Sequence, residues 1–219
     1  MAALAGELTG RPLTWAAADV TDRTAIANAV HQVETSLGPT DRLIACAGIG
    51  RGTPADTLSA VEFEEIVRVN LVGVANSVAA VLPGMIARKK GHLVALSSLA
   101  SFWGVPRMAA YCASKAGLNA LFDSLAMELA PYRIQVSVVC PGFIRTPMTT
   151  ALQHEFRDMM ELDVAVGRIL NAIAKKKRFV AFPIRAALML RILRCLPATW
   201  ADWVMRRRAK NFLGDGGAA

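Results

Sequence analysis

Two side chains that can carry proton chemistry lie one turn apart on a predicted helix. Tyr111 and Lys115 are separated by four positions within Ala110–Leu129, a helical pattern that Pro131 stops. A tyrosine hydroxyl titrates near pH 10, and a neighbouring ammonium lowers that pKa because it stabilises the phenolate. The pair can therefore act as a general acid and base. The same spacing also occurs in ordinary amphipathic helices, so its meaning depends on the surrounding elements.

Apolar runs alternate with helical patterns along the body of the chain. The predicted strands are Leu13–Val20, Arg42–Ala47, His92–Ser97, Ile134–Val139 and Arg178–Phe182. The predicted helices are Asp22–Leu37, Ser59–Ala87 with interruptions at Gly73 and Pro83, Ala110–Leu129 and Val164–Ala174. Near-continuous apolar strands between helices indicate an α/β fold with a doubly wound parallel sheet.

Polar residues and glycines stand at the carboxyl ends of these predicted strands. Asp19 lies near the end of the first strand, Gly48 follows the second, and Ser97 and Ser98 end the third. Pro141–Gly142 follows the fourth. Because ligands bind beyond the carboxyl ends of parallel strands, we expect these residues to form one site with the helical pair.

Taken in order, these motifs resemble the short-chain dehydrogenase/reductase family. The matching motifs are DV at 19–20, AG at 47–48, VNLVG at 69–73, SS at 97–98, YCASK at 111–115 and PGFIRT at 141–146. The resemblance covers about residues 13–150. It implies a Rossmann-like fold and an NAD(P)-dependent oxidoreductase that interconverts a carbonyl and an alcohol.

The resemblance also implies four catalytic roles. Tyr111 would exchange a proton with the substrate oxygen, and Ser98 would hydrogen-bond that oxygen. Lys115 would lower the pKa of Tyr111 and bind the nicotinamide ribose. Asn70 would hold a water that relays protons to Lys115, although it could also be an ordinary helix-bend residue. The family spacing to the tyrosine favours Ser98 over Ser97, which we expect to be a structural neighbour.

A cofactor, NAD or NADP, is implied by the same resemblance. Ile144 and Thr146 would hold its carboxamide, Gly48 would allow a close backbone approach, and Asp19 and Val20 would lie against its adenine. Asp19 or Asp22 could instead cap the following helix. The full set of expected cofactor contacts is Asp19, Val20, Ala47, Gly48, Asn70, Tyr111, Lys115, Pro141, Gly142, Ile144 and Thr146.

The chain departs from the family at its start. The family's TGxxxGxG turn, which cradles a pyrophosphate at a helix N-terminus, does not occur. We therefore expect the fold to lack its first βαβ unit, through either a misplaced start or a real loss. The residue that selects NAD or NADP belongs to that unit, so this choice stays open. Cys46 also stands where the family usually has Asn.

Basic residues are concentrated in the last quarter of the chain. Residues 164–219 hold twelve Lys/Arg and two Asp/Glu, whereas the remainder holds thirteen and fifteen. We expect residues 1–183 to form the incomplete Rossmann-like domain and residues 184–219 a basic amphipathic helical extension. Such an extension can lie on an anionic membrane surface. The alternatives are a solvated face packed on the domain or an oligomer contact, and no motif supports nucleic-acid binding.

The four cysteines are isolated from one another and from histidines. This spacing predicts free, buried thiols in a reducing cytoplasm, with neither a disulfide framework nor a metal site.

The resemblance makes a homo-oligomer plausible through the helices that carry Asn70 and Tyr111. A non-catalytic scaffold that uses the basic tail at membranes is the rival function. An apolar substrate is suggested by the predicted lid residues Phe143, Met148, Leu152, Phe156, Met159 and Met160.

Overall fold

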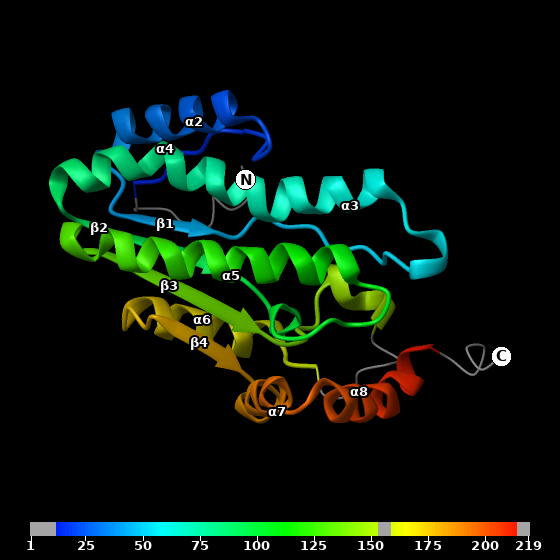
Figure 1. Cartoon of the computed structure of the whole chain (residues 1–219). Coiled ribbons are helices and arrows are strands. Elements are labelled where there is room, and N and C mark those ends of the chain that lie inside the picture. Colours follow the sequence, from blue (N-terminus) through cyan, green and yellow to red (C-terminus); the bar gives the residue numbers. More distant parts are fainter. Residues whose placement is uncertain (1–11, 153–158, 214–219) are drawn as a thin grey trace.

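The computed structural model describes residues 12–152 and 159–213. The described strands form one parallel sheet in the order β1-β2-β3-β4 (Figure 1). They are β1 (Arg42–Ala45), β2 (Gly91–Leu96), β3 (Ile134–Pro141) and β4 (Phe179–Phe182). The main helices are α2 (Arg23–Leu37), α3 (Ala60–Val67), α4 (Gly73–Arg88), α5 (Ala109–Leu129), α6 (Leu162–Ala174), α7 (Ile184–Cys195) and α8 (Ala198–Leu213).

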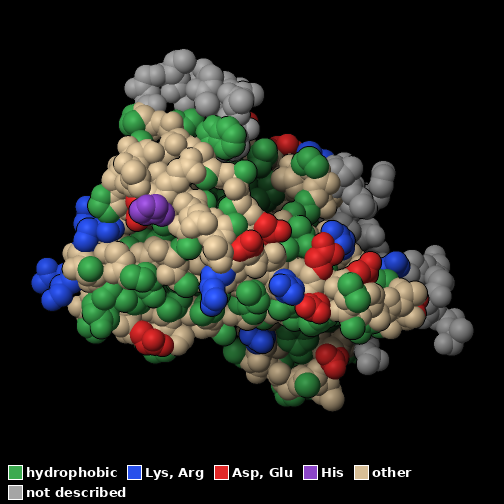
Figure 2. All heavy atoms as spheres, turned by 90° about the horizontal axis from the view of Figure 1, so that it is seen from above, with side chains coloured by type: hydrophobic (Ala, Val, Ile, Leu, Met, Phe, Trp, Pro, Cys, Tyr) green, Lys and Arg blue, Asp and Glu red, His purple; other side chains and the backbone are tan. Residues whose placement is uncertain are grey.

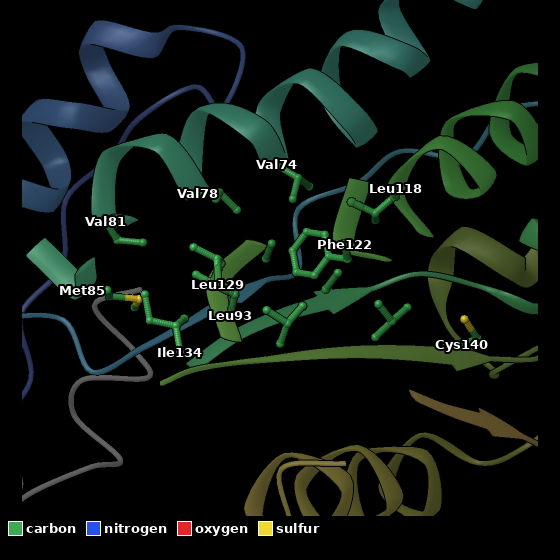
Figure 3. Packing of buried hydrophobic residues seen from close by; sticks show 14 of the residues in the cluster. Val74, Val78, Val81, Met85, Leu93, Leu118, Phe122, Leu129, Ile134 and Cys140 are labelled. Atoms are coloured by element: carbon green, nitrogen blue, oxygen red, sulfur yellow. The ribbon is translucent and has the colours of Figure 1, made fainter. Parts of the chain in front are cut away.

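Alternate side chains of β2, β3 and β4 enter two hydrophobic cores, one on each face of the sheet. On β2, Leu93 and Ala95 belong to one core and Val94 to the other. Helices α4 and α5 cover the first face, where Val78 and Phe122 pack over the strands (Figure 3). Helix α6 covers the second face. This packing confirms the predicted doubly wound parallel sheet.

The helical stretch Ala60–Arg88 is continuous, so the predicted interruptions at Gly73 and Pro83 are wrong. Pro83 lies inside α4, and a π-helical turn (Arg68–Val72) joins α3 to α4. Gly73 serves a close contact instead, because an added Cβ would lie 2.6 Å from Cγ2 of Val20. By length and composition this stretch could cross a membrane. Its second half, α4, packs on the sheet through Val74, Val78, Val81 and Met85.

The predicted strand Leu13–Val20 is not formed. Its residues alternate between exposed and partly buried, as in an extended chain, but the described residues offer it no neighbouring strand. A lone extended segment has no partner for its backbone hydrogen bonds, so it is not a strand. Its last residue, Val20, packs against Gly73 of α4, and the side-chain amide of Asn76 donates to the Val20 carbonyl at 2.9 Å.

The β1 edge of the sheet is open in the described part of the chain. β1 pairs with β2 on one side, and Leu43 and Ile44 are partly exposed on the other. A cavity of about 180 Å³ lies beside β1.

Two of the four cysteines are exposed. They are Cys46, which directly follows β1, and Cys195 at the end of α7, so the prediction of four buried thiols is wrong for these two.

Helix α7 packs against the body through one of its sides. Ala187 and Leu193 are buried, and the Arg191 guanidinium lies 5.6 Å from the ring centre of Phe102 and 5.1 Å from that of Phe179. In Figure 1, α7 and α8 lie beside the end of β4. A domain boundary at residue 183 stays a prediction.

Candidate active site

Ser98 and Tyr111 meet at the carboxyl end of β2. Ser98 begins a short 3₁₀ turn (Leu99–Ser101), and its hydroxyl accepts a hydrogen bond from the Ala100 amide at 3.1 Å. The Ser98 side chain lies within hydrogen-bonding reach of the Tyr111 phenol. Ser97 is buried, and its hydroxyl donates to the Lys115 carbonyl at 3.3 Å. Ser98, unlike Ser97, therefore lies beside the Tyr111 phenol, and its catalytic role stays a prediction.

Lys115 is almost completely buried one turn after Tyr111. Its side chain is 5% exposed, and Nζ donates to the Leu96 carbonyl at 2.9 Å. Nζ also lies 5.7 Å from the centre of the Tyr111 ring. Burial lowers the pKa of Lys115 to about 8, because a buried ammonium loses its hydration. Lys115 is therefore a cation at neutral pH that titrates in the alkaline range.

The pKa of Tyr111 is raised, whereas the family resemblance implied that Lys115 would lower it. Burial of the phenol is the main cause and outweighs the opposing hydrogen bond from Ser98. Burial disfavours the charged form of an acid. Tyr111 is consequently protonated at neutral pH, the state that a proton donor requires.

Asn70 is fully buried in the π-helical turn and ties three segments together. Its amide nitrogen donates to the Ile49 carbonyl at 2.9 Å and to the Ser114 hydroxyl at 3.0 Å, and its oxygen accepts from the Ile49 amide at 2.8 Å. An added Cβ at Gly48 would lie 3.2 Å from the Asn70 oxygen and 3.5 Å from Nζ of Lys115. Gly48, Asn70 and Lys115 therefore surround one small space. The water relay through Asn70 stays a prediction.

The segment after β3 folds back on itself near the site. Pro141 ends β3, and an added Cβ on Gly142 would lie 2.9 Å from Cδ of Pro183. The Thr149 hydroxyl donates to the Ile144 carbonyl at 2.5 Å, and it accepts from the Thr146 amide at 3.0 Å. Thr149 thus fixes the two residues that were predicted to hold a carboxamide.

The structure decides which of the two aspartates caps the first helix, while the adenine contacts of Asp19 and Val20 stay a prediction. Asp22 caps α2, since its carboxylate accepts from the amides of Thr24 and Ala25 at 2.8 and 3.0 Å. The exposed Asp19 carboxylate instead accepts from the amide and hydroxyl of Thr21, and these bonds lower its pKa. Of the predicted contacts, Val20 and Ala47 line the cavity beside β1.

A second polar network behind the site was not predicted from the sequence. Ser101 donates to the Ser98 carbonyl at 2.5 Å, and the Asn119 amide donates to the Ser101 hydroxyl at 2.8 Å. Asn119 lies two helical turns after Tyr111, so it links α5 to the turn that holds Ser98. Helical spacing from Tyr111 and Lys115 was the one available signal for Asn119, and nothing in the sequence marked Ser101 as its partner.

Comparison with known proteins identifies the family. Residues 1–157 match the model of the short chain dehydrogenase family. The chain is 34% identical over 189 residues to an uncharacterized oxidoreductase of Myxococcus xanthus, covering 86% of this chain and 75% of the relative. It is 37% identical over 150 residues to a 3-oxoacyl-[acyl-carrier-protein] reductase of Thermotoga maritima, covering 68% of this chain and 61% of the relative.

A solved structure supports the same assignment. The crystal structure of a gluconate 5-dehydrogenase from Burkholderia cenocepacia, in complex with NADP and tartrate, aligns with a TM-score of 0.59 at 33% identity. The alignment covers 61% of this chain and 52% of that one. The chain thus spans about three fifths of the Thermotoga reductase and about half of the Burkholderia enzyme. From the match of residues 1–157 to the family model and from these relatives, the chain belongs to the short-chain dehydrogenase family.

Proposed function

We propose that this protein is an NAD- or NADP-dependent oxidoreductase that interconverts a carbonyl and an alcohol. The observation that carries the proposal is the meeting of the Ser98 hydroxyl and the protonated Tyr111 phenol one turn from the buried Lys115 ammonium. Two relatives add support: the Thermotoga protein is a 3-oxoacyl-[acyl-carrier-protein] reductase, and the Burkholderia dehydrogenase binds NADP.

The site fits the nicotinamide end of such a cofactor. Gly48 leaves open a space beside Asn70 and Lys115 that any Cβ would narrow. The Lys115 ammonium faces this space and is suited to hold ribose hydroxyls, while Ile144 and Thr146 would hold the carboxamide. The phosphate-cradling TGxxxGxG turn does not occur in the sequence, so we assign no residue to the pyrophosphate. NAD(P) bound there would supply or accept the hydride.

Reduction follows from the protonation states of the site. A substrate carbonyl oxygen placed between Ser98 and Tyr111 would accept hydrogen bonds from both hydroxyls. The phenol of Tyr111 would transfer its proton to that oxygen as negative charge develops there. The Lys115 ammonium would stabilise the resulting phenolate through its positive charge. Asn70, which holds the Ile49 backbone and Ser114, keeps these groups in place.

We propose an apolar substrate. An added Cβ at Gly50 would lie 3.4 Å from Sδ of Met148 and 3.6 Å from the Tyr111 ring, so Met148 and Tyr111 flank the same point. Two further predicted lid residues are Met159 and Met160. Met159 is buried, and the backbone of Met160 forms a β-bridge with that of Ile144. Phe156 lies outside the described residues, as does the side chain of Leu152.

We also propose that the protein is a cytoplasmic homo-oligomer that binds no nucleic acid. On the face that carries α2, α3 and α4, hydrophobic side chains lie among scattered charges (Figure 2). Val61 and Phe63 on α3 and Val72 in the π-helical turn are exposed, and they lie on the helical stretch with Asn70 that the family resemblance assigned to subunit contact. Sedimentation velocity of the Val61→Glu variant beside wild type tests this contact.

Titration of the chain with NADH and NADPH, followed by cofactor fluorescence, tests the central proposal. Saturable binding that a Gly48→Val substitution weakens supports an oxidoreductase. Binding that the Gly48→Val substitution leaves unchanged would place the cofactor elsewhere. An absence of binding by folded protein would favour the rival, a non-catalytic scaffold with a short-chain dehydrogenase fold.

A further inference from the structure

Helices α7 and α8 carry an exposed apolar surface. Ile184, Leu188 and Ile192 recur every four residues along one side of α7. Trp200 and Trp203 lie one turn apart on α8. These five side chains, which we call the C-terminal apolar face, are each between 53 and 76% exposed. Clustered large apolar side chains in water mark an interaction surface.

The other side of α7 is already used for packing. Ala187 and Leu193 are buried against the body, and Arg191 stacks on Phe102 and Phe179. The exposed side is therefore not the side on which α7 folds onto the sheet. On α8, Ala201 is buried while Trp200 and Trp203 on either side of it are exposed. Both helices thus keep an apolar side that the described part of the chain leaves uncovered.

The charge around this face selects its partner. Residues 184–213 contain seven Lys/Arg and one Asp/Glu. Arg185 and Arg194 are exposed on α7, and the Arg207 guanidinium lies 4.0 Å from the ring centre of Trp203. Apolar and tryptophan side chains bordered by arginines match the boundary between acyl chains and anionic headgroups. A positively charged rim would repel an identical rim, so it disfavours a second copy of this chain as the occupant.

The face begins next to the proposed catalytic site. The Gly142 amide donates to the Phe182 carbonyl at 2.7 Å, and an added Cβ at Gly142 would meet Pro183 at 2.9 Å and Leu99 at 3.2 Å. Pro183 directly precedes α7, and Leu99 directly follows Ser98. A partner docked on the exposed side of α7 would therefore lie close to the carboxyl ends of the strands, where the substrate would enter.

We propose that the C-terminal apolar face docks on an anionic phospholipid bilayer, with α7 and α8 lying in its interface. Ile184, Leu188, Ile192, Trp200 and Trp203 enter the acyl boundary, and the arginines bind lipid phosphates. This places the site opening at the membrane surface, so an apolar carbonyl or alcohol reaches Tyr111 from the lipid. The last step rests on the proposed oxidoreductase function, whereas the docking itself does not.

Flotation with lipid vesicles tests the docking. Vesicles of equal parts phosphatidylcholine and phosphatidylglycerol are compared with vesicles of phosphatidylcholine alone, at low and high salt. The wild-type chain is expected to float with the anionic vesicles, and high salt to weaken binding roughly tenfold because screening removes the arginine contribution. The tryptophan emission should shift to the blue on binding, and Trp203→Phe should reduce that shift.

A matched pair of variants distinguishes docking through the C-terminal apolar face from nonspecific hydrophobic adsorption to the vesicles. Leu188→Glu/Ile192→Glu should lower the vesicle affinity at least roughly tenfold, because two carboxylates would enter the acyl boundary. Val166→Glu/Leu170→Glu replaces exposed apolar residues with the same four-residue spacing on α6 and should change it less than about twofold. Circular dichroism checks that both variants fold.

Three outcomes would overturn the docking proposal. They are no flotation at low salt, equal losses in the two double variants, and a Leu188→Glu/Ile192→Glu variant that instead breaks up a vesicle-free oligomer in sedimentation velocity. None of these readouts involves cofactor or turnover. Failure of the oxidoreductase proposal would therefore appear separately, in the cofactor titration.

Discussion

The Asn70 side-chain amide lies 3.0 Å from the Ser114 hydroxyl, and this bond joins the π-helical turn to the helix that carries Tyr111 and Lys115. The Ser114 hydroxyl in turn donates to the Tyr111 carbonyl at 2.8 Å. A buried polar chain of this kind holds catalytic groups only while every member is satisfied. The geometry of the proposed catalytic site therefore depends on Asn70 even though Asn70 lies outside α5.

Substitution of Asn70 by alanine should destabilise the fold by about 2–4 kcal/mol, because the partly buried Ile49 amide and carbonyl both lose their partners. Urea unfolding followed by circular dichroism measures the change. Asn76→Ala is the control: it removes a single bond, to the Val20 carbonyl, and should cost about 1 kcal/mol. Equal costs for the two variants would argue against a special role of Asn70.

Replacement of Lys115 by methionine should stabilise the protein while abolishing turnover. The pKa of Lys115 is about 8 in the folded state against 10.5 in the unfolded chain, so burial of the charge opposes folding at neutral pH. The gain at pH 7 should be about 1–3 kcal/mol, after loss of the bond to the Leu96 carbonyl. Thermal unfolding at neutral pH measures it.

The lowered pKa of Lys115 also determines how the stability of the protein changes with pH. Between the two values the unfolded chain binds more protons, so wild-type stability should rise relative to Lys115→Met as pH increases from about 8 to 10. A constant difference between the two proteins across this range would contradict the burial of a charged Lys115. Turnover in the direction of reduction should fall over the same range, because the stabilising cation is lost.

His92 should make the fold sensitive to acid. It is 2% exposed between Arg42, whose Nε lies 3.2 Å from its Nδ1, and Ser137, whose hydroxyl lies 2.8 Å from its Nε2. Since the Arg42 nitrogen only donates, His92 is neutral and Nε2 donates to Ser137. Burial and the charges of Arg42 and Lys176 lower the pKa of His92 to about 4.

As the pH falls from about 6.5 to 4, His92 is protonated in the unfolded chain but stays neutral in the folded chain, so stability falls. The loss attributable to His92 should be about 1–3 kcal/mol in this window. Urea unfolding of His92→Gln should show a flatter pH dependence than wild type. His31→Gln changes an exposed histidine and should retain the wild-type slope. Identical slopes for all three proteins would exclude His92 as the cause.

Gly142 should not tolerate a side chain, because a Cβ would lie 2.9 Å from the Pro183 ring. Gly142→Ala should cost about 1–3 kcal/mol and loosen the contact between the strand end and α7. Gly167→Ala on α6 is the matched control: its Cβ would meet nothing within 4 Å, and it should gain roughly 0.5–1 kcal/mol from helix propensity. Differential scanning calorimetry of both variants checks this, and a neutral Gly142→Ala would contradict the tight packing.

The sequence predicts the parts of the site that depend on local periodicity. Tyr111 and Lys115 share a helix, and Gly48, Ser98 and Gly142 follow strands, so helical spacing and sheet geometry were sufficient to bring them together. Residues 13–20 show where this reasoning fails. Their apolar pattern is that of a strand, but a strand also needs a neighbour to accept its hydrogen bonds.

Contacts between distant segments lay beyond sequence reasoning. The Asn119–Ser101–Ser98 network joins residues from α5 and the turn after β2, and no local pattern specifies that pairing. The direction of the Tyr111 pKa shift depends on burial, which outweighs the hydrogen bond from Ser98. The exposed side of α7 likewise follows from which of its residues the body happens to cover.

The most direct measurement is the rate of NADPH oxidation by the wild-type chain and by Tyr111→Phe, with 2-octanone and a 3-oxoacyl thioester as substrates. Tyr132→Phe, which alters the other tyrosine of the chain, is the control. The proposed mechanism predicts wild-type turnover, a loss of roughly 10²–10⁴-fold in Tyr111→Phe with cofactor binding preserved, and no loss in Tyr132→Phe. Turnover by Tyr111→Phe at the wild-type rate, or none above buffer in the wild-type chain, would contradict it.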